Sequence, residues 1–310
     1  MLNFHVVNSV KGGCGKTTVS LYLANYLRKQ DNHYPVIIDL DICGSTWYSN
    51  NKIYIKNEGK VFLNDLFYNF EKNSSKNYLT ELNIKDDLNW GKLKVIMVNS
   101  NKLTSMDDDT LDIIENTIFQ IVHQQSYPKY DMEAKEEKII DFIFDLPPGY
   151  EKHSERIVRH LLMNLRSPLY KKKYNIYLYM VSTVNQAAFN ANLRYVHSLF
   201  ENPQYSMDNS ILKQQNILFI LNDINSILVN LQKRTINAQQ SLKETLESTK
   251  KAEFSKCKIE ILQHIDFEHE IERLKNITKG DEVSKFLEFK DDKEPFENIF
   301  KEFLGKGGQS

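Results

Sequence analysis

Short apolar runs alternate along this chain with longer stretches in which apolar residues recur every three or four positions. The runs are nearly continuous and rich in Val and Ile, which is typical of strands buried on both faces of a parallel sheet. They cover residues 4–10, 36–41, 92–100, 141–146, 175–183, 216–223 and 258–265. The helical pattern covers residues 17–30, 108–124, 154–166, 186–200 and 224–254. This alternation predicts an α/β fold with a doubly wound, mostly parallel sheet flanked by helices.

The length and composition of the chain fit one large domain with a substantial core. It has 310 residues, of which 41% are hydrophobic, and neither an internal repeat nor a Pro/Gly/Ser-rich linker interrupts it. We therefore expect a single domain over residues 1–280, followed by a C-terminal helical tail over residues 281–310. The net charge is −1, but residues 151–260 hold 16 Lys and Arg against 9 Asp and Glu. A basic face is compatible with that imbalance, although a solvated surface explains most such biases.

A glycine-rich segment follows the first predicted strand and opens the first predicted helix. Its sequence, "VKGGCGKT" over residues 10–17, matches the phosphate-loop pattern G-x-x-x-x-G-K-[ST], except that Val10 replaces the first glycine. Gly12, Gly13 and Gly15 allow backbone N–H groups to approach phosphate oxygens, and the helix N-terminus adds a favourable dipole. A plain glycine turn is the alternative, but the residues that follow favour a nucleotide site.

Three side chains after the glycines suit a nucleotide that carries Mg²⁺. Lys16 is placed to reach the β- and γ-phosphates, and Thr17 to coordinate Mg²⁺ through its hydroxyl. Thr18 is placed to contact the α-phosphate. The segment therefore predicts a phosphate-binding loop with a metal ligand built into it.

Two more predicted strands end in aspartates, at the edge where a doubly wound sheet binds its ligands. The segment "VIIDLDICG" carries Asp39 and Asp41, and "FIFDLPPG" carries Asp145 and Gly149. We expect Asp39 and Asp145 to hold Mg²⁺, because carboxylates beside a phosphate loop serve as metal ligands. The Gly149 N–H is placed to contact a γ-phosphate. A single aspartate there is as often a turn or helix cap, so the interpretation depends on all three motifs together.

These motifs resemble those of the ParA/MinD superfamily of P-loop ATPases. The segment "KGGCGKTT" (residues 11–18) matches the deviant Walker A motif of that family. The two aspartate segments and "FILNDIN" (residues 219–225) occupy the places of its later motifs. The resemblance extends from residue 3 to residue 275. It implies a P-loop NTPase fold, ATP and Mg²⁺ as cofactors, and a homodimer that forms on ATP binding.

The resemblance also implies roles for particular residues. Lys11 matches the signature lysine, which reaches across the dimer to the nucleotide of the other subunit, and Asp41 matches the aspartate that positions water. Together with Lys16, these two residues form the expected catalytic set. Asn222 matches the residue that reads the adenine base. Slow hydrolysis of ATP, accelerated by a partner protein, is implied as well.

Three functions are compatible with such an ATPase. We favour a ParA-type partition or positioning ATPase, whose ATP-bound dimer binds DNA or cargo non-specifically through lysine–phosphate contacts. The candidate lysines are residues 171–173, Lys250, Lys251, Lys256 and Lys258. A carrier or chaperone ATPase without DNA binding is less favoured, because such relatives use paired cysteines. The cysteines of this chain, Cys14, Cys43 and Cys257, are far apart and form no C-x-x-C.

The third function is that of a MinD-like ATPase that cycles on a membrane through a terminal helix. The chain ends in a predicted amphipathic helix, whose apolar face is formed by Phe296, Ile299, Phe300, Phe303 and Leu304. Its polar face is neutral rather than basic, which weakens attraction to anionic lipid. Packing of this helix on the core is the simpler expectation, so membrane contact is less favoured than DNA.

We expect a cytoplasmic location. The odd, dispersed cysteines argue against a disulfide framework and fit a reducing compartment. The first residues enter a predicted strand without the charged region of a signal peptide, and no apolar run approaches the ~18 residues that span a bilayer.

Overall fold

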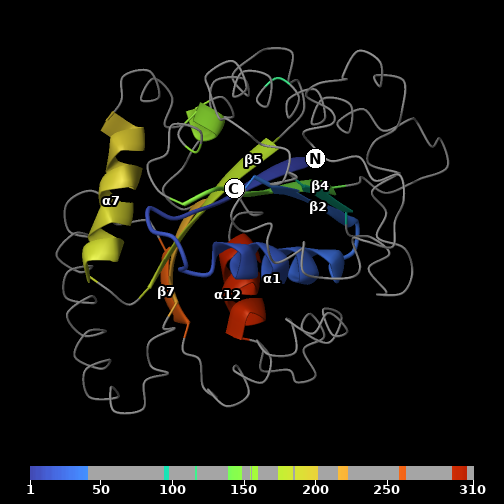
Figure 1. The fold of residues 1–310 in the computed structure, drawn as a ribbon. Coiled ribbons are helices and arrows are strands. Elements are labelled where there is room, and N and C mark those ends of the chain that lie inside the picture. The colour runs from blue at the N-terminus through green and yellow to red at the C-terminus, as the bar shows by residue number, and fades with distance from the viewer. Residues whose placement is uncertain are drawn as a thin grey trace, which may run out of the picture.

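The fold is built on a seven-stranded sheet with helices packed on it (Figure 1). The computed structural model describes residues 1–40, 94–97, 116, 139–148, 154, 156–159, 174–183, 186–201, 216–222, 258–262 and 295–305. The strands are β1 (Leu2–Asn8), β2 (His33–Asp39), β3 (Lys94–Met97), β4 (Ile139–Asp145), β5 (Tyr174–Thr183), β6 (Ile217–Asn222) and β7 (Lys258–Leu262). The helices with described bounds are α1 (Lys16–Arg28), α7 (Gln186–Glu201) and α12 (Pro295–Gly305).

The topology of the described strands confirms the predicted fold class. Their order is β3-β2-β4-β1-β5-β6-β7, and every pair of neighbours is parallel. Each predicted strand corresponds to one of these seven, and the predicted helices at 17–30 and 186–200 correspond to α1 and α7. Residues 154 and 156–159 are helical, as predicted for 154–166. The predicted helix at 224–254, and that at 108–124 apart from helical Asn116, lie outside the described residues.

Helices cover both faces of the sheet. Successive side chains of a strand point to opposite faces, and because the strands are apolar nearly throughout, both faces need to be covered. On one face, Val7, Tyr179 and Ile220 belong to a core cluster that includes side chains of α1 and α12. Figure 1 shows these two helices together below the sheet. On the other face, Phe219 of β6 meets Phe189 of α7 edge to face, with ring centroids 5.6 Å apart. Burial on both faces explains the nearly continuous apolar sequence of the strands.

The predicted C-terminal helix is α12, and its apolar face is packed on the core. Phe300 and Phe303 meet the ring of Tyr179 edge to face, with centroids 6.1 Å and 5.5 Å away. Phe300 also contacts Tyr26 of α1, at 5.9 Å. The division into residues 1–280 and a tail at 281–310 stays a prediction, because residues 263–294 lie outside the described part. No helix of the described residues has the length and apolar character needed to cross a membrane.

A buried polar network links β1, β2, β4 and β5, and Asp141 lies at its centre. Its carboxylate accepts a hydrogen bond from Asn3 Nδ2 at 2.7 Å and lies 3.1 Å from His5 Nε2 and 2.7 Å from His33 Nδ1. His5 Nδ1 in turn lies 3.0 Å from the Tyr179 hydroxyl oxygen. Burial opposes ionisation of Asp141, but the hydrogen bonds of His33 and His5 outweigh it and lower its pKa to about 2. The network therefore holds a charged carboxylate inside the sheet.

Candidate nucleotide-binding site

The predicted phosphate loop connects the end of β1 to the start of α1. Gly13 and Gly15 have φ values of +69° and +95°, a left-handed conformation that residues with a side chain rarely adopt. A Cβ atom at Gly13 would meet no other atom within 4 Å, so the backbone conformation, and not a lack of space, requires glycine there. Gly12 approaches the segment after β4, where an added Cβ would lie 3.6 Å from Pro148.

The start of α1 has the properties of an anion-binding helix terminus. Gly15 is its N-cap and supplies no side-chain cap, and the first turn contains no acidic residue. The positive end of the helix dipole and the N–H groups of the first turn are therefore directed at the loop. Lys16, the first helical residue, is only 5% exposed, and Thr17 is half-buried. The side chain of Thr18 lies outside the described part of the structure.

Side chains hold the first half of the loop. The Ser9 N–H donates to Asn8 Oδ1 at 2.8 Å, and the Val10 N–H donates to Asn192 Oδ1 at 3.0 Å. The Ser9 hydroxyl accepts from the Lys11 N–H at 3.2 Å and donates to the Lys11 carbonyl at 2.8 Å. These bonds replace strand pairing, so β1 ends at Asn8 and not at Val10 as the apolar pattern predicts. Lys11 itself is exposed.

Asn192 of α7, which the sequence did not suggest as a site residue, connects this loop to β5. Its Nδ2 donates to the Val181 carbonyl at 2.9 Å while its Oδ1 accepts from the Val10 N–H. The side chain is buried, at 1% exposure. The signal available in the sequence was an asparagine on the apolar stripe of the helix, three residues after Phe189 and four before Val196. Its partner Val10 is 182 positions away, so no local pattern reveals the bond.

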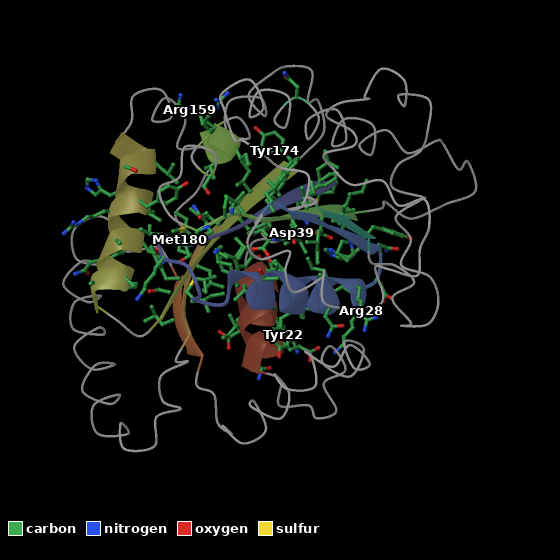
Figure 2. The ribbon with its side chains drawn as sticks, in the orientation of Figure 1. Tyr22, Arg28, Asp39, Arg159, Tyr174 and Met180 are labelled. Atoms are coloured by element: carbon green, nitrogen blue, oxygen red, sulfur yellow. The ribbon has the colours of Figure 1, made fainter. Side chains whose placement is uncertain are left out.

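Asp39 and Asp145 lie next to each other at the carboxyl ends of β2 and β4, as expected. The strand register pairs them directly, and on the other side of β4 it pairs Asp145 with Val7 of β1. Each aspartate is 1% exposed. The Leu40 N–H donates to the Asp145 carbonyl at 2.9 Å, which extends the pairing past Asp39. Figure 2 shows the side chains in this region, with Asp39 on β2 labelled.

The remaining predicted site residues are described in part or not at all. Asn222 is the last residue of β6, paired with Thr183 and Leu262, so it ends at the same edge of the sheet as the loop. Its side chain, like Asp41 and Gly149, lies outside the described residues.

Cys14, within the loop, has the environment of a core side chain. It is 1% exposed and belongs to the core cluster with Val7 and Val19. Burial raises the pKa of its thiol, and a hydrogen bond with Ser9 and the charge of Lys16 offset this only partly. A protonated, buried thiol reacts slowly, which argues against a redox role for Cys14.

The described groups fit a nucleotide polyphosphate with a divalent cation. The left-handed glycines and the uncapped helix start offer N–H groups to phosphate oxygens, and Lys16 adds a positive charge. The Thr17 hydroxyl and the carboxylates of Asp39 and Asp145 are oxygen ligands of the kind that Mg²⁺ prefers. The donor set thus separates into an anion-binding part and a cation-binding part, on neighbouring elements of one sheet edge.

Comparison with known proteins agrees with this geometry. The ParA family model, described as NUBPL iron-transfer P-loop NTPase, matches residues 1–60, which include the loop and β2. No curated protein gives a significant match.

Solved structures share the fold along nearly the whole chain. McdA from Cyanthece superposes with a TM-score of 0.56 at 16% identity, over 98% of this chain and 100% of that one. The MinD cell division protein of Aquifex aeolicus gives 0.53 at 16% identity, over 99% and 98% of the two chains. A putative plasmid partition protein of Borrelia burgdorferi, bound to AMPPNP, gives 0.52 at 12% identity over 98% of each chain. Over residues 1–60 this protein is thus similar to the ParA family of P-loop NTPases, and along nearly the whole chain it shares its fold with the MinD, McdA and plasmid partition structures.

Proposed function

We propose that this protein is an Mg²⁺-dependent ATPase of the ParA type, which dimerises on binding ATP and then binds DNA or cargo. The observation that carries the proposal is the loop before α1. Two left-handed glycines and an uncapped helix start are followed at once by the buried Lys16, beside the paired carboxylates of β2 and β4. A structural turn needs none of these charged groups, whereas a Mg²⁺–ATP site uses all of them.

Each group at this edge has a proposed task in ATP binding. The N–H groups around Gly12, Gly13 and Gly15, with Lys16, hold the β- and γ-phosphates, and Thr18 contacts the α-phosphate. The Thr17 hydroxyl holds Mg²⁺ together with Asp145 and Asp39. Mg²⁺, when bound, offsets the negative charge that develops on the phosphates. Gly149 contacts the γ-phosphate, and Asn222 reads the base.

Hydrolysis in this proposal depends on the dimer. Lys11 is exposed although its backbone is fixed, so its side chain is available to a second subunit. A cation that arrives from the other subunit offsets phosphate charge only when two ATP-loaded subunits meet, in the manner of an arginine finger. Asp41 orients the attacking water. The low turnover of such a site rises when a partner protein stabilises the competent arrangement.

The ligand of the ATP-bound dimer is proposed to be DNA or cargo rather than a membrane. The apolar face of α12 is occupied by the core, with Phe300 fully buried and Phe303 only 4% exposed. Binding to lipid would first require that face to leave Tyr26 and Tyr179. The lysines proposed to contact DNA, including those at 171–173, lie outside the described residues or have undescribed side chains. We propose the cytoplasm as the compartment.

Sedimentation velocity with Mg²⁺–ATP or Mg²⁺–ADP tests the dimer. The Asp41→Ala variant should bind ATP, hydrolyse it poorly and accumulate as a dimer, while Lys16→Ala stays monomeric. The Asp41→Ala dimer is then titrated with non-specific duplex DNA across a salt series. Binding that requires ATP and weakens steeply with salt supports phosphate contacts. A confirmed dimer that binds no DNA at low salt removes DNA from the proposal. An Asp41→Ala variant that stays monomeric with ATP contradicts the ATP-driven dimer.

A further inference from the structure

From the contacts around Val10 we infer that Asn192 is a positioning residue for Lys11. It holds the first half of the phosphate loop to β5, so that the exposed Lys11 side chain is presented to a second subunit. The inference rests on the proposed ATP-dependent dimer, because the cross-subunit role of Lys11 belongs to that proposal.

The carboxamide of Asn192 is suited to this bridge because it has a donor and an acceptor on one rigid plane. The acceptor end takes the N–H of Val10, and the donor end gives a hydrogen to the carbonyl of Val181. The two backbone groups come from different elements, the loop after β1 and strand β5. Because Asn192 is 1% exposed, water does not compete for either bond.

The hydrogen bond that fixes the backbone of Val10 also limits the movement of the backbone of Lys11. Val10 precedes Lys11 in the chain, and the Ser9 hydroxyl binds both the N–H and the carbonyl of Lys11. The N–H groups of residues 9–11 are therefore all bound to side chains. The main chain at Lys11 cannot turn without breaking one of these bonds. A catalytic group loses much of its effect when it is displaced by about 1 Å, so a fixed backbone matters at this residue.

Asn216 offers a matched control for a purely structural role. Like Asn192, it is a buried asparagine that binds β5: its Nδ2 donates to the carbonyl of Ile176 at 3.0 Å. Asn216 precedes β6 and lies toward the amino end of β5, whereas the loop lies at the carboxyl end. Asn216→Ala therefore removes a similar hydrogen bond without touching the phosphate loop.

Hydrogen–deuterium exchange of the nucleotide-free protein tests the bridge without any activity. In Asn192→Ala, the amide of Val10 should exchange about tenfold faster than in the wild type, since its buried acceptor is gone. Asn216→Ala should leave exchange in residues 9–12 unchanged. Wild-type protection of Val10 in Asn192→Ala, or equal loss of protection in Asn216→Ala, overturns the inference.

A double-mutant cycle with Lys11→Ala tests the positioning role. Asn192→Ala should lower kcat about tenfold and leave KM for ATP within about twofold, because the ATP-binding half of the loop is not touched. The double variant should be no slower than Lys11→Ala alone, since Asn192 acts through that lysine. Additive losses, or the same fall in kcat in Asn216→Ala, overturn the positioning role.

The two measurements separate failure of the inference from failure of the proposed function. If the wild type neither dimerises nor hydrolyses ATP, the cross-subunit role of Lys11 is wrong. The role of Asn192 in positioning Lys11 for that purpose is then wrong as well. Exchange at Val10 then still decides whether Asn192 holds the loop. If the wild type is active and Val10 exchange in Asn192→Ala is unchanged, the inference alone is wrong.

Discussion

Asp39 and Asp145 are paired in register across β2 and β4, and each is almost completely buried. Neighbouring buried carboxylates repel each other when both are ionised, and a cation relieves that repulsion. In the proposed Mg²⁺–ATP site, their position beside the loop before α1 would couple metal binding to nucleotide binding, because both ligands would lie at the same sheet edge.

We predict that Mg²⁺ is required for the full stabilisation that ATP gives, and that Asp145→Asn removes the Mg²⁺-dependent part. In the wild type, Mg²⁺–ATP at about 100 times its Kd should raise Tm by about 5 °C, and ATP with EDTA should raise it less. Differential scanning fluorimetry under both conditions measures the difference. Asp31→Asn, at an exposed position before β2, is the control and should behave as the wild type. An Asp145→Asn variant with an undiminished Mg²⁺ effect would exclude Asp145 as a ligand.

Lys16→Ala should abolish ATP binding without unfolding the protein. Lys16 is the first residue of α1, and its loss removes the main positive charge proposed for the β- and γ-phosphates while leaving the strands and core unchanged. Titration with a fluorescent ATP analogue, combined with a thermal melt of the apo protein, measures both properties. Lys29→Ala changes an exposed lysine just past the other end of the same helix and should bind normally. Wild-type affinity in Lys16→Ala would show that the phosphates are held elsewhere.

The strands could be predicted because burial on both faces leaves a strong local signal. Phe142 and Ile143, for example, point to opposite faces, and both are fully buried. The end of β1 could not be predicted, because it depends on the bond between Val10 and Asn192 of α7. The glycines, Lys16 and the aspartates could be proposed as site residues from the sequence, because the chemistry expected of them is tied to short spacings.

The buried polar network around Asp141 could not be predicted from the sequence for a related reason. His5 and Asp141 belong to apolar runs that are 136 residues apart, and only the register of β1 against β4 brings them together. A periodic pattern shows that a strand is buried, but it does not show which strand is its neighbour.

The charge of Asp141 should make the protein sensitive to acid. Its pKa is about 2 in the folded state, against an ordinary value of 3.8. A carboxyl group whose pKa is lowered on folding stabilises the protein above its unfolded pKa, and this contribution, about 2 kcal/mol, disappears as the pH falls from about 4 to about 2. Urea unfolding of the wild type and of Asp141→Asn at several pH values measures it. The difference in unfolding free energy should be largest above pH 5 and shrink toward pH 2. A difference that does not depend on pH would mean that the carboxylate contributes by packing alone.

Phe300→Ala tests whether α12 is docked in solution. The side chain is fully buried between Tyr26 and Tyr179, so its removal should lower the free energy of unfolding by about 4 kcal/mol. Lys301→Ala changes the exposed neighbour on the same helix and should alter stability by less than about 0.5 kcal/mol. Chemical denaturation of both variants provides the comparison. Equal stability of the two would mean that the apolar face is not held by the core. A liposome co-sedimentation assay with Mg²⁺–ATP would then decide whether a membrane takes up that face.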